Sequence, residues 1–247
     1  MLDLDGNALG GKRYLDNEGG HQLEVDPTGI VVLARALTRN RTLCTLRLND
    51  NELSPTHEVF SEKAKGFVSG QTKVGDLVEF DGREQLVRSV AHVNRFRLLL
   101  KDSTDIRALS GALKENSTLT CLELGGNDLC EVDMRLLAEP LRVNRTLGHL
   151  GLQRNRLGVE AIELLSEALA HNRGLTSLNL DCNPITHSTA SLAALLRPGA
   201  SKSAYSSKGI SSFAKMLAEQ PTLTSLSLAN AGLYEEGAKL IAEALRG

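Results

Sequence analysis

One pattern, L-x-x-L-x-L-x-x-N-x-L, recurs along the chain and restricts the folds that are open to it. Three consecutive copies begin at Leu119, Leu147 and Leu175, so each copy starts 28 residues after the one before it. Further copies, one lacking its first position and one with alanine in place of asparagine, begin at Leu2, Leu43 and Leu223. Self-similarity at a fixed period of this length is typical of proteins that stack one structural unit many times.

The segment that follows each copy has the spacing of an amphipathic helix. After Leu157, residues Ile162, Leu165 and Leu169 stand at positions i, i+3 and i+7, which lie on one face of a helix. Equivalent triplets occur in the other units, around Leu33, Leu109, Leu137, Phe213 and Ile241. Several of these helices should end at an asparagine in the left-handed conformation that tolerates this residue, namely at Asn40, Asn116, Asn144 and Asn172.

The pattern therefore predicts one short strand and one helix in each repeat unit. The two leucines of L-x-L should point inward, and because a single unit cannot bury its apolar face, neighbouring units must stack to do so. Leucine accounts for 45 of the 247 residues and aromatic residues for only 3%, so the core should be aliphatic. We predict an α/β solenoid that forms a single domain over residues 1–247.

The repeat resembles the leucine-rich repeat superfamily, and specifically the 28-residue class found in ribonuclease inhibitor and NLR proteins. The resemblance covers about two-thirds of the chain. It implies a curved horseshoe with parallel inner strands and outer helices. From the residues between the copies we also expect inserted β-hairpin segments.

Three gaps between copies are longer than one period. The distances from Leu2 to Leu46, from Leu46 to Leu122 and from Leu178 to Leu226 are 44, 76 and 48 residues. The extra residues predict inserts at about 10–25, 68–103 and 197–206.

The first insert has two strand-like runs around Gly19-Gly20, which predicts a hairpin. The second predicts a three-stranded antiparallel sheet, and an alternative interpretation makes Gln85–Asn94 a degenerate repeat helix. Before this insert we expect a repeat helix carrying Val59, Phe60, Ala64 and Phe67. The third insert is polar, and we expect it to replace the strand of a degenerate unit.

The inserts fall after a strand and before a helix, so they should project from one rim of the horseshoe. Such inserts often mark a binding face, although solenoids also tolerate neutral loop growth. The concave strand positions are small and polar, with Arg47 and Arg154 as their strongest candidate anchors. Our candidate partner-binding residues on the rim and the concave face are Arg13, Tyr14, Arg47, Phe80, Arg83, Arg88, Arg95 and Arg154.

Cys121 and His149 occupy equivalent positions in consecutive strands and should be adjacent. A thiol beside an imidazole can begin a nucleophile pair or a metal site. However, Ser177 and Thr45 share the same column, and the sequence shows no orienting acid. No nucleotide, hydrolase or zinc motif occurs either, so we predict no catalytic residues, no cofactor and no metal.

The formal net charge of −2 and a pI near 6.3 argue against a dedicated nucleic-acid binder. No apolar run reaches the length of a membrane span. The acidic N-terminus is unlike a secretory signal and the four cysteines lack zinc or redox spacing, so we expect a cytoplasmic protein. Neither end shows a polar capping element, so we expect apolar ends that pack against other chains, unless the sequence is a fragment.

These observations favour a non-enzymatic scaffold that binds other proteins through its insert-bearing rim and its ends, within a hetero-oligomeric complex. The resemblance to repeat-only proteins of this class suggests a ciliary, flagellar or other cytoskeletal setting. Two alternatives stay open: a RanGAP-like GTPase activator, and a binding or sensor module similar to ribonuclease inhibitor or NLR proteins. The C-terminal sequence EEGAKLIAEALRG lacks the acidic tail that RanGAP-like proteins usually carry.

Overall fold

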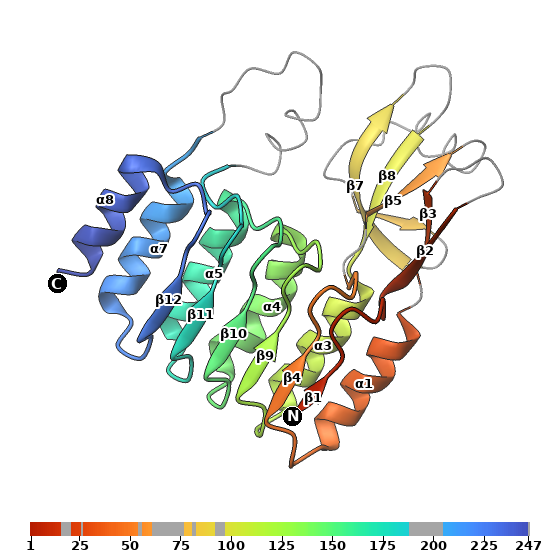
Figure 1. The fold of residues 1–247 in the computed structure, drawn as a ribbon, viewed down its shortest axis with the longest axis horizontal. Coiled ribbons are helices and arrows are strands. Elements are labelled where there is room, and N and C mark those ends of the chain that lie inside the picture. The colour runs from red at the N-terminus through yellow and green to blue at the C-terminus, as the bar shows by residue number, and fades with distance from the viewer. Residues whose placement is uncertain are drawn as a thin grey trace.

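The computed structural model describes residues 1–15, 21–25, 27–53, 56–60, 77–80, 83–91, 97–187 and 205–246. A parallel sheet of short strands lines one face of the molecule (Figure 1). Among the described residues its strands follow one another in the order β1 (Leu2–Asp3), β4 (Thr45–Arg47), β9 (Cys121–Glu123), β10 (His149–Gly151), β11 (Ser177–Asn179) and β12 (Ser225–Ser227). Each strand carries one copy of the repeat, as the sequence predicts.

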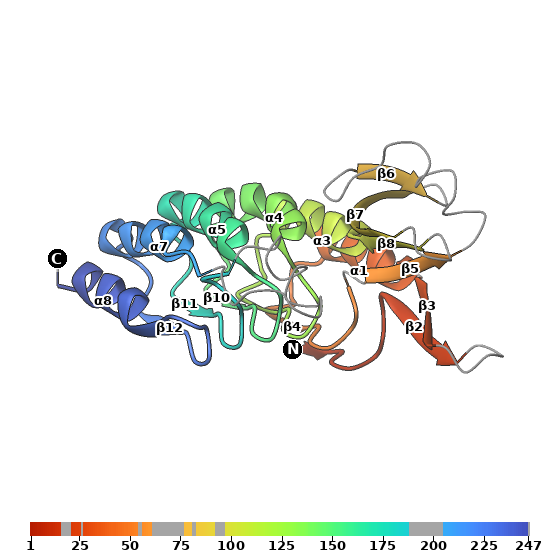
Figure 2. The same ribbon diagram turned by 90° about the horizontal axis from the view of Figure 1, so that it is seen from above.

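A layer of helices covers the opposite face of this sheet (Figure 2). They are α1 (Thr28–Arg39), α3 (Thr104–Glu115), α4 (Glu131–Val143), α5 (Val159–His171), α7 (Lys208–Glu219) and α8 (Tyr234–Ala244). Between the two layers lies an aliphatic core in which the leucines of successive strands stack. Leu122, Leu150 and Leu178 are directly paired in register and fully buried, so the ladder expected from the 28-residue shift is confirmed.

The asparagine of the repeat forms a second, polar ladder beneath the strands. Oδ1 of Asn127 accepts a hydrogen bond from the backbone N–H of Asn51 at 2.8 Å, and Oδ1 of Asn155 accepts one from Asn127 at 2.9 Å. Nδ2 of Asn127 also donates to the carbonyl of Leu48 at 2.8 Å. Since an unpaired buried backbone group costs about 1–3 kcal/mol, this side chain explains why the repeat needs asparagine.

The asparagines that end the helices do not adopt the left-handed conformation that we expected. Asn116 and Asn144 have φ of −75° and −66° and ψ of 130° and 132°, which is extended backbone. Oδ1 of Asn116 accepts hydrogen bonds from the N–H groups of Thr118 and Leu119, while its Nδ2 donates to the carbonyl of Leu37 in the preceding helix. The prediction was wrong because asparagine acts here through its side chain.

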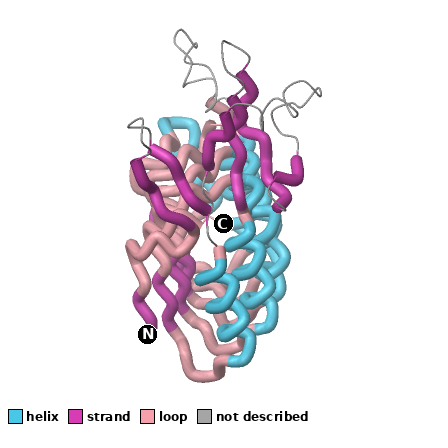
Figure 3. Tube along the Cα trace, turned by 90° about the vertical axis from the view of Figure 1, so that its right-hand side faces the viewer, coloured by secondary structure: helices cyan, strands magenta, loops and turns pink. Residues whose placement is uncertain are grey.

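The first two inserts form β structure. Strands β2 (Gly11–Leu15) and β3 (His21–Val25) make the expected antiparallel hairpin. The second insert is larger than expected: β5 (Thr56–Phe60), β8 (Arg97–Asp102), β7 (Arg83–Ala91) and β6 (Leu77–Phe80) form an antiparallel sheet in that order. Figure 3, which looks along the solenoid, shows these strands gathered at one rim.

Several predictions about the inserts were wrong. Val59 and Phe60 lie in β5, a strand that pairs with β8, instead of a helix; Ala64 and Phe67 lie outside the described residues. The alternative helix at Gln85–Asn94 is excluded over its described part, because β7 extends to Ala91. The two apolar residues of this segment, Val59 and Phe60, are adjacent, so no alternation in the sequence indicates the strand.

The third insert does not stand in for a strand. β11 pairs directly with β12 through Leu178 and Leu226, which leaves no vacant strand position between them. Most of residues 197–206 lies outside the described part of the chain, but His187 and Tyr205 on either side of the gap form an antiparallel bridge. All three long gaps are therefore single repeats with extra residues after the strand and before the helix.

The first two inserts leave the solenoid at one place. A Cβ atom on Gly10 would overlap the carbonyl oxygen of Glu52 and would lie 2.7 Å from Oδ2 of Asp105. Gly10 begins the first insert, whereas Glu52 and Asp105 lie just before and just after the second. The second insert thus has its two ends close together, which explains how the solenoid accommodates it without losing register.

Candidate functional site

The concave face of the solenoid is built from columns of side chains that the strand register aligns. One column contains Cys121, His149 and Ser177, each of which faces away from the buried leucines of its strand. The next column places Glu123 between Arg47 and Gly151. Because the sheet is parallel and unshifted, residues 28 positions apart become direct neighbours.

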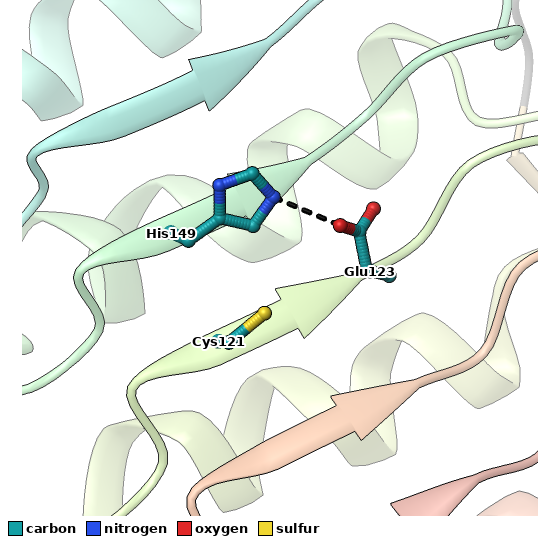
Figure 4. A group of neighbouring side chains, drawn as sticks. All are labelled: Cys121, Glu123 and His149. Carbon is teal, nitrogen blue, oxygen red and sulfur yellow. Dashed lines mark hydrogen bonds and ion pairs between the residues drawn. The ribbon is translucent and has the colours of Figure 1, made fainter. Parts of the chain in front are cut away.

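Cys121, Glu123 and His149 form a cluster on β9 and β10 (Figure 4). Nε2 of His149 lies 2.9 Å from Oε1 of Glu123, and Nδ1 of the same ring lies 2.9 Å from Oγ of Ser177. One metal-binding atom from each residue of the cluster lies within 4.8 Å of those from the other two. From the sequence we inferred that no acid orients the imidazole. This inference was wrong, because the carboxylate of Glu123 contacts Nε2 of His149.

Gly151 makes this geometry possible. It is the cross-strand neighbour of Glu123, and a Cβ atom on it would overlap Oε2 of the Glu123 carboxylate. The missing side chain lets the carboxylate fold over β10 toward the imidazole. Gln153 also contacts the carboxylate, with its Nε2 donating to Oε2 of Glu123 at 3.3 Å.

The thiol of Cys121 is kept protonated by its surroundings. Partial burial raises the pKa of this thiol above its usual value, and the negative charge of Glu123 raises it further, while Arg47 opposes both. Since the thiolate is the nucleophilic form, the free thiol at this position has low reactivity at neutral pH.

A hydrogen-bonded chain of serine, histidine and carboxylate is also the arrangement of a nucleophilic triad. Acyl transfer additionally needs free N–H groups that stabilise an oxyanion. The N–H groups of Thr176 and Ser177 both donate to the carbonyl of Gly148, at 2.8 and 2.9 Å. The backbone at Ser177 is therefore committed to the sheet, and the cluster favours binding over acyl transfer.

The two predicted anchors of the concave face are paired with carboxylates. Arg47 contacts Asp3 at 2.9 Å and Asp5 at 2.8 Å, and Arg154 contacts Asp50 at 2.7 Å. Their side chains stay about half exposed, so each pair contributes at most about 1 kcal/mol to folding. They remain candidates for partner contact.

The other predicted residues belong to the inserts. Arg13 and Tyr14 lie in β2. Phe80 ends β6 and pairs with Arg83, the first residue of β7, and Arg88 stands at a register shift in β7. Arg95 lies outside the described residues. The described residues of this set lie in two separate sheets. Among the residues that the structure describes, none of them is seen to contact Arg47 or Arg154.

Sequence reasoning missed a further exposed feature at the base of the third insert. The rings of Tyr205 and Tyr234 meet edge to face, with centroids 5.5 Å apart, and Tyr234 is 65% exposed. Tyrosine is enriched at protein interfaces. The two residues are 29 positions apart and belong to different segments, so no local pattern reveals the pair.

A family model described as "Leucine Rich repeat" matches residues 115–129, which contain β9 and the ladder asparagine Asn127. Together with the repeated strand and helix units, this match supports a leucine-rich repeat protein. A comparison with curated protein sequences gives no match.

Two solved structures are similar to part of this chain. One is the leiomodin-1 actin-binding site 2, with 20% identity and a TM-score of 0.42 over 57% of this chain and 72% of that chain. The other is the C-terminal domain of tropomodulin from Caenorhabditis elegans, with 15% identity and a TM-score of 0.41 over 57% of this chain and 74% of that chain. Within the described residues, no helix is both long and apolar enough to cross a bilayer.

Proposed function

We propose that this protein is a non-enzymatic scaffold that binds other proteins within a larger intracellular assembly, in a cytoskeletal setting such as a ciliary or flagellar axoneme. The observation that carries the proposal is the protruding rim, defined here as the hairpin β2–β3 together with the sheet β5–β8–β7–β6. Both elements leave the solenoid at one rim (Figure 1), and β3 lies against β5.

The protruding rim supports protein binding for a physical reason. The solenoid core closes without it, because β1, β4 and β9 pair in the same register as the uninterrupted strands. Residues that the core does not need are available for contact with a partner. The rim carries Arg13, Tyr14, Phe80 and Arg83 in its strands, and aromatic and arginine side chains commonly dominate binding energy.

A rim-deletion variant tests the proposal. Residues 54–102 are replaced by a short Gly/Ser linker, which removes β5 together with its partner β8 and joins two points that both lie near Gly10. Cross-linking with mass spectrometry in the native complex then compares the neighbours of the wild-type chain and of the variant. Circular dichroism and thermal unfolding confirm that the variant remains folded.

We expect the variant to lose its cross-linked neighbours while the matched control Arg142→Ala, at a half-exposed side chain of α4 outside the rim and the concave face, keeps them. Retention of the same neighbours by the folded deletion variant would show that the sheet β5–β8–β7–β6 is not the binding site. Stimulation of GTP turnover on a small GTPase by the wild-type chain would instead favour the GTPase-activator alternative.

A further inference from the structure

The cluster of Cys121, Glu123 and His149 is chemically distinct from the rest of the concave face. It combines a thiol, an imidazole and a carboxylate, which are the three side-chain types that bind zinc in proteins. We infer that these three residues bind one Zn²⁺ ion through Sγ of Cys121, Nε2 of His149 and a carboxylate oxygen of Glu123. This inference is independent of the proposed scaffold function.

The distances in the cluster are close to those that a zinc ion requires. Ligand atoms bound tetrahedrally at about 2.0–2.3 Å from the ion lie about 3.3–3.6 Å apart. The Nε2–Oε1 distance is 2.9 Å, and one possible ligand atom from each of the three residues lies within 4.8 Å of those from the other two. The three side chains stand on two adjacent strands, so side-chain rotation can bring their ligand atoms to these separations.

The histidine is already oriented for this role. A metal-bound imidazole normally uses its second nitrogen in a hydrogen bond that fixes its tautomer and its orientation. Oγ of Ser177 lies 2.9 Å from Nδ1 of His149, so it can accept a hydrogen bond from Nδ1–H, which leaves the lone pair of Nε2 for the ion. Ser177 is a positioning residue in this arrangement.

The carboxylate is supported in the same way. Gly151 leaves the space that Glu123 occupies, and Gln153 donates to its Oε2. Oε1 of Gln153 is buried and has no hydrogen-bond partner among the residues that the structure describes. With three protein ligands, the fourth position of the ion is left for water, and this oxygen supplies an acceptor next to the carboxylate.

The local charge also permits a cation. Arg47 lies beside Glu123 in the sheet and would repel the ion, but it is engaged by Asp3 and Asp5. The cluster is only partly buried, so an ion can reach it from solvent. Binding converts the Cys121 thiol to thiolate and releases its proton to solvent, which balances the step without an oxidant or a reductant.

The first test is a competition titration of the full-length chain with Zn²⁺ and a chromophoric chelator. We expect one bound ion whose affinity falls by more than about 100-fold in Cys121→Ser, His149→Gln and Glu123→Gln, since even supporting residues change affinity about 10–100-fold. Ser177→Ala should weaken binding by about tenfold. The matched control Cys182→Ser, at an exposed cysteine outside the cluster, should bind as the wild type does.

A second measurement needs no variant. Alkylation of the wild-type chain is followed cysteine by cysteine with mass spectrometry, with and without Zn²⁺. We expect Zn²⁺ to slow the modification of Cys121 severalfold while exposed Cys44 and Cys182 react at unchanged rates. Three results would each overturn the inference: the wild type binds no Zn²⁺, the three ligand variants bind Zn²⁺ as tightly as the wild type, or Zn²⁺ leaves the alkylation rate of Cys121 unchanged.

Discussion

The uninterrupted repeats around β9, β10 and β11 and the interrupted repeats around β1 and β4 share one core but differ in length. Leu150, in the uninterrupted part, is 1% exposed, and Leu46, in the interrupted part, is 0% exposed. Equivalent leucines of β4 and β9 are 76 residues apart, and those of β9 and β10 are 28 residues apart. Both pairs of strands nevertheless have the same register. Strand register in this fold thus depends on the stacked leucines and not on the length of the connection.

The largest effect should come from removing a stacked leucine. Leu150→Ala and Leu46→Ala should each lower the free energy of unfolding by about 2–5 kcal/mol, since both open a cavity in a fully buried ladder. Urea denaturation followed by circular dichroism measures both values. If Leu46→Ala costs far less than Leu150→Ala, the interrupted repeats are not part of the same cooperative core.

A smaller effect should appear where the inserts leave the solenoid. Gly10→Ala should destabilise the protein by about 1–3 kcal/mol, because the new methyl group would overlap the Glu52 carbonyl oxygen. Gly111→Ala, at an exposed position in α3 with open space around it, should instead raise stability by about 0.5–1 kcal/mol. Thermal unfolding measures the stability of both variants. An unchanged melting temperature in Gly10→Ala would contradict close packing of Gly10 against Glu52 and Asp105.

The smallest effect should come from the ion pair that joins the two regions across the concave face. Arg154 in the turn after β10 contacts Asp50 in the turn after β4, and Gly126 lies between them, where a Cβ atom would overlap Oδ1 of Asp50. Because both side chains are about half exposed, Arg154→Ala should cost less than about 1 kcal/mol. The loss of stability caused by Arg154→Ala should be smaller at high salt. Denaturation of the wild type and the variant at two ionic strengths tests this expectation.

The sequence predicted the parts of the fold that depend on local periodicity. The positions of Leu122, Leu150 and Leu178 fixed which strands pair and which residues face outward, so the adjacency of Cys121 and His149 was also predictable. The strand β5 was not predictable in this way, because Thr56–Phe60 is stabilised by pairing with β8, about forty residues away in the chain. The segment has only two apolar residues, Val59 and Phe60, which is too few to show a period that separates a strand from a helix.

The candidate site shows the same division. The repeat by itself determined the α/β solenoid, the buried leucine ladder and the columns of the concave face, because the leucines of each copy must stack on those of its neighbours whatever the length of the connection. Only the tertiary structure decided that Glu123 turns toward His149, because this depends on the space above Gly151 and on the hydrogen bond from Gln153. Side-chain direction across strands is set by packing volume, which no single copy of the repeat encodes.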